Sequence, residues 1–482
     1  MMAHDARTPS SPTPTTTSTA TSTTSSTPLA AVPPTAARAL AESLFAAAVR
    51  GADPYAATER ALDRGALGIA VGARPWVIAA GKAAAPMARA TIDVLASVER
   101  IVEGGLVVTN DASATAKPLP LVTGDHPLPG PGSRDAADAV GRLLPLIQPG
   151  DDVFVLLSGG ATSLMAAPVD GISDASMLAL FRGLHRSGAP IEVMNAFRKR
   201  VMRWGGGRLG AALSGAGARV TCLIASDVIG DDAASIASGP CSEDRHTASD
   251  LIELAQQQRL WSVIPDEVRT YLDHTLTGEV QETPKPGSDA LRGIVPRIIL
   301  GNSDALDAAQ AAARAVGLAV RVAPTPITGI AHSTGDAIAR AAVVARAALP
   351  GRPTPAGILT TPCRLALIWG GETTVALGAT SGLGGRAQEL ALAAARALHE
   401  AGAEGRGITI LAAGTDGRDG PTDAAGAIVD ARTWARIALN GRAPERDLAT
   451  HDAHPALDAA GALLRTGMTG TNVNDVVLVL ID

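Results

Sequence analysis

The feature that most constrains the fold of this chain is a repeated unit of three parts. A short apolar run is followed by a turn containing glycine and then by a segment with helical spacing, as in PWVIAAGKAAAPMARATIDVL (75–95) and DDVFVLLSGGATSLM (151–165). Continuous apolar strands are typical of parallel sheets that helices cover on both faces. The repetition therefore predicts an α/β fold with a doubly wound, Rossmann-like parallel sheet.

The unit occurs in both halves of the chain, which indicates two domains. A length of 482 residues suggests two or three domains at roughly 100–200 residues each. We predict an N-terminal α/β domain over 37–275, a polar linker over 276–295 and a second α/β domain over 296–482. Residues 1–36 are rich in Ser, Thr and Pro and are predicted to be disordered. Because ligands of open α/β sheets bind beyond the carboxyl ends of strands, we expect the site in the cleft between the two domains.

Composition excludes several classes of function. The chain is 46% hydrophobic with a formal net charge of -6, and a nucleic-acid-binding surface would instead be basic. It has no apolar run of the roughly 18 residues that a membrane helix needs. Three cysteines without a CxxC pair fit a reducing compartment. We therefore expect a cytoplasmic protein with small-molecule partners and no nucleic-acid or membrane partner; the oligomeric state stays open.

Two turns after predicted strands carry groups suited to phosphate. Lys82 follows a strand and a glycine and opens a helix, where backbone N–H groups favour an anion. The surrounding residues do not form a P-loop. The second turn, Ser158, Gly159 and Gly160 followed by Thr162, offers N–H and hydroxyl donors. A tight turn with a Thr or Ser cap is the structural alternative for the second turn.

A basic segment and a glycine-rich segment add two more candidate cations. Arg198 begins RKRVMRWGGGR (198–208), which either faces an anionic ligand or forms a solvated helix surface. Arg386 follows Gly384 and Gly385 in GLGGRA (382–387), at the start of an alanine-rich helix. The same letters satisfy G-x-G-x-x-A, so a dinucleotide site is an alternative, although the expected acidic residue at the end of the next strand is missing.

Acidic loops follow two of the predicted strands. Asp227 and Asp231 lie in SDVIGDDAASIASGP, and Asp416 lies in GTDGRDGPTD. Carboxylates at strand ends suit Mg²⁺, which proteins bind through one or two carboxylates together with phosphate oxygens. Asp227 and Asp231 are the candidate metal ligands, and Asp416 is the candidate for orienting a hydroxyl, although the residues alone do not rank the three between metal and base roles. Turn formation is the structural alternative.

Together these features indicate phosphoryl transfer, which requires positioning, charge neutralisation and a metal for the nucleotide phosphates. Lys82 from one domain and Arg386 from the other would neutralise the transferred group. Ser158, Gly159, Gly160, Thr162, Arg198, Gly384 and Gly385 are the predicted substrate- and phosphate-binding residues. ATP and Mg²⁺, or another divalent cation, are the implied cofactors.

The motifs also resemble those of the type-2 glycerate kinase family, which combines a DUF4147 domain with a MOFRL domain. The matching stretches include AAGKAAAPM, LLSGGATSLMAAPVDGI, SDVIGDDAASIASGP, GLGGRAQELALA and TGMTGTNVNDVVLVLI, and they run in order from about residue 39 to 482. The resemblance places MOFRL at about 365–480 and implies two α/β domains with the site between them. It also implies ATP-dependent phosphorylation of D-glycerate at the 2-hydroxyl, with Lys82 and Arg386 as catalytic residues.

Several positions depart from the family pattern. Arg200, Met202 and Gly205 stand where relatives carry His, Ser and Lys, Ala387 replaces an Asn, and GIAHS (329–333) replaces the GEAR region. These departures bear on substrate identity. They leave open a kinase for a related sugar acid, an NAD(P)H-dependent hydroxypyruvate reductase, and an inactive sugar-acid sensor.

Overall fold

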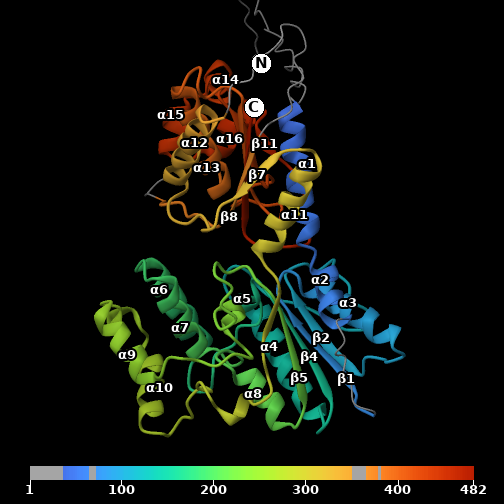
Figure 1. Ribbon diagram of the computed structural model, residues 1–482. Coiled ribbons are helices and arrows are strands. Elements are labelled where there is room, and N and C mark those ends of the chain that lie inside the picture. The colour runs from blue at the N-terminus through green and yellow to red at the C-terminus, as the bar shows by residue number, and fades with distance from the viewer. Residues whose placement is uncertain (1–35, 64–71, 350–364, 378–381) are drawn as a thin grey trace, which may run out of the picture. The chain divides into compact units, whose positions relative to one another are not determined.

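The computed structural model describes residues 36–63, 72–349, 365–377 and 382–482. The predicted tail therefore lies outside the described residues except for Ala36, which begins helix α1 (Figure 1). None of the helices in the described part of the chain has the length and apolar character needed to cross a bilayer.

The first sheet has six strands, all of them parallel, in the order β3-β2-β1-β4-β5-β6. The strand order reverses between β1 and β4, as in a doubly wound sheet. The prediction for this half is confirmed. The bounds are β1 (Pro75–Ala80), β2 (Gly104–Thr109), β3 (Leu121–Thr123), β4 (Asp152–Ser158), β5 (Arg219–Ala225) and β6 (Arg297–Leu300).

Helices cover both faces of this sheet because alternate side chains of each strand point to opposite faces. In β1, Val77 and Ala79 join one apolar core and Ile78 and Ala80 join the other. The helices of this half are α2 (Pro54–Asp63), α3 (Ala84–Ser97), α4 (Pro131–Leu143), α5 (Ala161–Leu164) and α8 (Arg208–Gly215). Helices α1 (Ala36–Gly51) and α11 (Asn302–Ala315) instead pack against the second sheet, which is described below. Figure 1 shows α1 beside α11, and these two helices pack together.

A separate group of helices carries the basic segment. It comprises α6 (Asp174–Arg186), α7 (Ile191–Val201), α9 (Ala248–Gln257) and α10 (Asp266–Leu276). These helices share their own apolar core, which includes Leu180, Phe197 and Leu272. Short 3-10 turns occur at 144–146, 236–238, 261–263 and 289–291.

The second sheet is mixed, with the order β11-β10-β9-β12-β8-β7. Strand β12 runs antiparallel to both of its neighbours and β10 runs antiparallel to β9, so the parallel pattern of the first half is not repeated. The reason is local: only the loop 415–425, and no helix, joins β9 to β10, and parallel strands need a longer crossover. The strands are β7 (Ala319–Val322), β8 (Leu365–Gly371), β9 (Ile408–Gly414), β10 (Gly426–Asp430), β11 (Leu463–Leu464) and β12 (Asp475–Ile481).

Helices cover this sheet as well. The alanine-rich α13 (Arg386–Glu400) packs on one face together with α12 (Ala331–Ala347), and small side chains allow the close approach: a Cβ at Gly335 would lie 2.1 Å from the carbonyl oxygen of Leu390. The remaining helices are α14 (Thr433–Leu439), α15 (Pro444–Ala449) and α16 (Ala453–Ala459). The predicted α/β fold class is thus confirmed for both halves of the chain.

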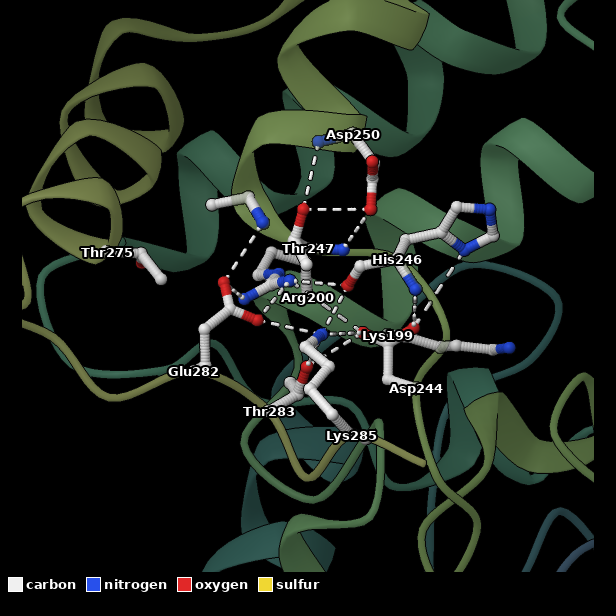
Figure 2. Close-up of polar contacts among 12 residues, drawn as sticks. Lys199, Arg200, Asp244, His246, Thr247, Asp250, Thr275, Glu282, Thr283 and Lys285 are labelled. Carbon is white, nitrogen blue, oxygen red and sulfur yellow. Dashed lines mark hydrogen bonds and ion pairs between the residues drawn. The ribbon is translucent and has the colours of Figure 1, made fainter. Parts of the chain in front are cut away.

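The change from the first sheet to the second falls between β6 and β7. The segment 276–295, which we predicted to be a linker, precedes β6, so the chain returns to the first sheet after it. Two of its residues, Glu282 and Thr283, contact the basic segment and Asp244 (Figure 2). The exact division into domains stays a prediction.

Candidate functional site

The first part of the site lies at the carboxyl ends of β1 and β4, the neighbouring strands at which the strand order of the first sheet reverses. The amide of Lys82 donates to the carbonyl of Gly159 at 2.9 Å, and the amide of Ala83 donates to Oγ of Ser158 at 3.0 Å. Gly81 allows this approach because a Cβ there would lie 2.1 Å from the Ser158 hydroxyl, and its φ of 128° also favours glycine. The two predicted phosphate turns are therefore neighbours that hydrogen-bond to each other.

Asp227, two residues after β5, lies against the same turn. A Cβ on Gly159 would be 1.9 Å from Oδ2 of Asp227, so this glycine makes room for the carboxylate. Burial raises the pKa of Asp227 to about 6, and the nearby Lys82 opposes that shift. Among the described residues the Asp227 carboxylate accepts no hydrogen bond from another side chain and forms no close ion pair. It is a largely dehydrated carboxylate that lacks a fixed partner.

The second part of the site lies where β8, β9 and β12 meet. Asp475 begins β12 and pairs with Gly371 at the end of β8 and with Gly414 at the end of β9. Its two oxygens accept from Nε and Nη2 of Arg386 at 2.7 and 2.9 Å. The third guanidinium nitrogen, Nη1, lies 2.5 Å from Oε1 of Glu372. Two carboxylates therefore hold the predicted catalytic arginine in place.

Contacts between residues of the two sheets join these parts. Nζ of Lys82 lies 3.5 Å from Oδ2 of Asp416. Nδ2 of Asn474 donates to the backbone oxygen of Asp227 at 2.8 Å and to Oε2 of Glu372 at 2.9 Å. Lys82, Asp416, Asp227, Glu372, Asn474, Asp475 and Arg386 thus form one connected set, called the charged cluster below.

The electrostatics of the charged cluster follow from burial and mutual attraction. Burial raises the pKa of Glu372. Burial acts in the opposite sense on Arg386, but the hydrogen bonds and charge of Asp475 raise its pKa overall, so the guanidinium stays charged. The backbone of Asn474 is also strained, because its φ is 65°. Non-glycine residues in this conformation are enriched at functional sites.

One hollow beside the cluster brings together three predicted binding residues. Gly160, Thr162 and Arg198 all line a cavity of about 860 Å³, together with His126. The hydroxyl of Thr162 is 3.1 Å from that of Ser238. The Arg198 guanidinium lies 5.4 Å from the centre of the Phe181 ring. These residues come from α5, α6, α7 and the loop after β3, so the sequence alone gives no sign that they meet.

A second hollow, of about 420 Å³, contains Gly384, Gly385 and Arg386. The helix start behind these glycines is already occupied by Asp419, whose carboxylate accepts from the amides of Ala387 at 3.2 Å and Gln388 at 2.8 Å. A Cβ on Gly385 would be 2.3 Å from the Asp419 carboxyl carbon. The glycine turn that we expected to hold phosphate thus holds a carboxylate of its own chain, and a binding role for Gly384 and Gly385 stays a prediction.

The basic segment 198–208 divides into residues with different partners. Arg200 is fully buried, and Figure 2 shows it paired with Glu282, at 2.9 and 3.1 Å. Arg203 pairs with Asp138, and Arg208 donates to backbone carbonyls and to the Tyr271 hydroxyl. Arg198 alone of the arginines in this segment lines the hollow. The departure at Arg200 is therefore a buried structural ion pair in this chain.

The predicted metal ligands separate in space. Asp227 belongs to the charged cluster, whereas Asp231 is exposed and its carboxylate lies beside Gly301, before α11. Within the described ranges no set of three His, Cys, Asp or Glu side chains is arranged to hold a metal ion. A metal at this site would therefore need phosphate oxygens as further ligands.

Sequence reasoning assigned no site role to Glu372, Asn474, Asp475, Asp419 and His126. The signals were present in part: WGGE ends one strand, and NVND precedes the last. What was not visible is that β12 runs antiparallel between β8 and β9, because only this order brings the start of one strand to the ends of two others.

Comparisons with known proteins identify the family of this chain. The domain of unknown function DUF4147 matches residues 40–273, and the MOFRL family matches residues 365–475. The fold and these matches define a protein of the DUF4147–MOFRL class.

A glycerate 2-kinase of Pyrococcus horikoshii is 35% identical over 91% of this chain and 96% of that relative. A protein of Agrobacterium vitis with the provisional name of a hydroxypyruvate reductase is 36% identical over 92% of this chain and 94% of its own length. The crystal structure of a glycerate kinase from Thermotoga maritima superposes with a TM-score of 0.76 at 33% identity, covering 92% of this chain and 99% of that structure. The chain belongs to the glycerate 2-kinase family.

Proposed function

We propose that this protein transfers the γ-phosphoryl group of ATP to the 2-hydroxyl of D-glycerate, giving 2-phosphoglycerate and ADP. The observation that carries the proposal is the charged cluster, in which Lys82 and Arg386 lie among carboxylates at the ends of strands. The family relationship supports the same reaction. Phosphoryl transfer is catalysed mainly by positioning and charge stabilisation, which are the properties of such a cluster.

The two cations have different roles in this proposal. Arg386 is fixed by Asp475 and Glu372, so its guanidinium would act as a preorganised clamp on the transferred group. Within the part of the chain that the structure describes, Lys82 pairs only with Asp416, at 3.5 Å, so it would be able to follow the phosphoryl group as it moves. The 2-oxygen of glycerate would form a bond to the γ-phosphorus while the bond to the bridging oxygen breaks and that oxygen leaves with ADP.

Asp416 would orient the 2-hydroxyl and accept its proton. Its carboxylate is half-buried and adjacent to Lys82, which places an acceptor beside the cation that faces the phosphoryl group. Lys82 also lines a hollow of about 650 Å³ whose walls carry the hydroxyls of Thr109, Ser113 and Thr115. Such hydroxyls suit a small polyhydroxy acid, which offers carboxylate and hydroxyl oxygens.

The residues present fit Mg²⁺ through Asp227. A buried carboxylate without a fixed partner is a suitable ligand for a hard cation, provided that nucleotide phosphates complete the coordination. When bound, the cation would neutralise phosphate charge. Asp231 fits this role less well because it is exposed and lies apart from the cluster.

The deciding experiment incubates the purified protein with ATP, Mg²⁺ and D-glycerate, measures ADP release, and identifies the product by phosphorus NMR. A 2-phosphoglycerate signal supports the proposal. Turnover on another sugar acid and not on glycerate would move the activity to a related acceptor. Oxidation of NADH with hydroxypyruvate in the absence of ADP release would replace the kinase by a reductase.

A further inference from the structure

The hollow that contains Arg198 is lined by several basic side chains. Arg182, His185 and Arg186 from α6 line it together with Arg198 from α7 and His126 from the loop after β3. None of the described residues that line it is an aspartate or a glutamate. We call this cavity the arginine hollow.

Among the residues that the structure describes, the arginines of this hollow have no carboxylate partner, unlike many arginines elsewhere. Arg74, Arg219 and Arg442 each pair closely with an aspartate. Within the described ranges Arg182 and Arg186 form no ion pair, and the nearest polar partner of Arg198 is the side-chain oxygen of Asn195 at 3.3 Å. Burial lowers the pKa of Arg198, which is the cost of holding this cation without a counter-charge. In a chain of net charge -6, such a concentration of unpaired cations indicates a polyanionic ligand.

The walls and the size of the hollow narrow the class of ligand. Pro127, Leu128, Ala179 and Phe181 make much of the lining apolar, and the cavity measures about 860 Å³. A three-carbon acid would leave most of that space empty, whereas a nucleotide would fill it. Pockets of this size with an apolar lining and a few convergent charges are typical of cofactor-sized ligands.

The arginine hollow also adjoins the charged cluster. A Cβ on Gly160, in the wall of the hollow, would lie 3.2 Å from the His126 ring and 3.5 Å from Cγ of Lys82. Partial burial and the Lys82 charge lower the pKa of His126, so this ring is mostly neutral at physiological pH. A phosphate chain held by the arginines can therefore extend past Gly160 to Lys82.

We propose that the arginine hollow binds the nucleotide donor, with Arg182, Arg186 and Arg198 contacting its triphosphate and the apolar wall contacting its nucleoside. This assignment rests on the proposed kinase function for the identity of the donor. It leaves the hydroxyl-lined hollow, which Lys82 also lines, for the hydroxy acid.

The test compares Arg198→Ala and the double variant Arg182→Ala/Arg186→Ala with the wild-type protein. Calorimetry measures the Kd of ATP, ADP and inorganic tripolyphosphate, and kinetics give KM for ATP and for glycerate separately. Charge-assisted contacts to phosphate are strong, so each variant should weaken ATP and tripolyphosphate binding by about tenfold or more. The KM for glycerate should stay within about twofold.

The matched control is Arg340→Ala, because Arg340 is an exposed arginine on α12 away from the hollow. It should change neither affinity. The double variant keeps the test decisive even if Arg198→Ala fails to fold, since Arg182 and Arg186 are exposed. Unchanged ATP binding in the double variant, or a rise confined to the KM for glycerate, would overturn the assignment. If the wild-type protein has no kinase activity yet binds tripolyphosphate through these arginines, the hollow assignment stands and the proposed reaction fails.

Discussion

Two glycine turns of this protein resemble each other in sequence but differ in what they enclose. The turn after β4, Gly159 and Gly160, opens toward the arginine hollow and leaves Asp227 without a fixed partner. The turn before α13, Gly384 and Gly385, encloses the Asp419 carboxylate, which two helix amides already bind. We call them the open turn and the closed turn.

The difference shows that a glycine turn before a helix indicates a site for an anion. It does not show whether that anion is a ligand or a side chain of the same protein. A helix start is favourable for any negative charge, including a carboxylate of the same chain. In the closed turn Asp419 uses that position to fix α13, and α13 in turn fixes Arg386. In the open turn the corresponding space stays available. In the proposed mechanism, the closed turn therefore positions Arg386 and the open turn leaves space for a ligand.

The largest expected effect is the loss of activity when Lys82 or Arg386 is replaced, and these two variants should differ in stability. Lys82→Ala should lower kcat by about 10³-fold or more, because one cation on the transferred phosphoryl group is lost, and should leave the free energy of unfolding nearly unchanged. Arg386→Ala should lose as much activity and also lower the free energy of unfolding by about 3 kcal/mol, because it strands the buried Asp475. Steady-state kinetics and urea unfolding measure the two quantities.

Matched variants sharpen this contrast. Arg386→Lys keeps the charge but cannot make the bidentate contact with Asp475, so it should recover stability only in part. If Lys82→Ala destabilised the protein as strongly as Arg386→Ala, the distinction between a mobile and a clamped cation would be wrong.

The next effect compares the two buried carboxylates, which have the same pKa of about 6. Asp227→Asn removes the cost of an ionised group without a partner and should stabilise the protein by about 1 kcal/mol at pH 7, with a loss of activity of about 10²-fold or more. Asp419→Ala removes the acceptor of two helix amides and should destabilise it by about 1–3 kcal/mol. Thermal unfolding at pH 7 measures both. If both variants stabilised the protein, or both destabilised it, the comparison would be contradicted.

The dependence on pH follows from the same two groups. Burial raises both pKa values from 3.8 to about 6, so the folded state binds more protons than the unfolded state between about pH 4 and 6. Their contribution to stability therefore decreases as pH rises through this window and is constant above it. Activity should change in the opposite direction, falling about tenfold per pH unit below pH 6 as Asp227 is protonated.

Asp227→Asn provides the control for this profile. It should remove about half of the stability gained between pH 7 and 5, while Asp419 supplies the rest. An acidic limb of kcat/KM that lies near pH 4 in the wild-type protein would exclude Asp227 as the ionising group.

Much of the fold and part of the site could be predicted from the sequence. The apolar runs followed by glycine turns predicted α/β architecture and placed Lys82, Ser158 and Asp227 at strand ends, where the structure has them. These predictions depend on local pattern alone. The partners of Arg386 could not be predicted, because Asp475 and Glu372 meet it only when β12 inserts antiparallel between β8 and β9.

The basic segment 198–208 illustrates the same limit on a smaller scale. The sequence does not distinguish its positive charges, yet Arg200 pairs with Glu282 in a buried network (Figure 2). Arg198, in contrast, lines the arginine hollow. The difference depends on Glu282, which lies 82 positions later. Composition and spacing along one helix carry no information on a partner so distant in the chain.

The smallest expected effects come from replacing Thr162, which lies beside the open turn, and Thr422, which lies beside the closed turn. Among the described residues, the Thr162 hydroxyl hydrogen-bonds only to the Ser238 hydroxyl. Thr162→Ala should therefore cost under about 1 kcal/mol of stability, with a rise of a few fold in the KM for ATP. The Thr422 hydroxyl, beside the closed turn, is buried, accepts from Nε2 of Gln388 at 2.9 Å and donates to the Asp419 carbonyl at 2.7 Å. Thr422→Ala should therefore cost about 1–2 kcal/mol and leave both KM values unchanged. Kinetics and urea unfolding of the two variants side by side test the comparison, and a change in KM for Thr422→Ala alone would reverse the roles of the two turns.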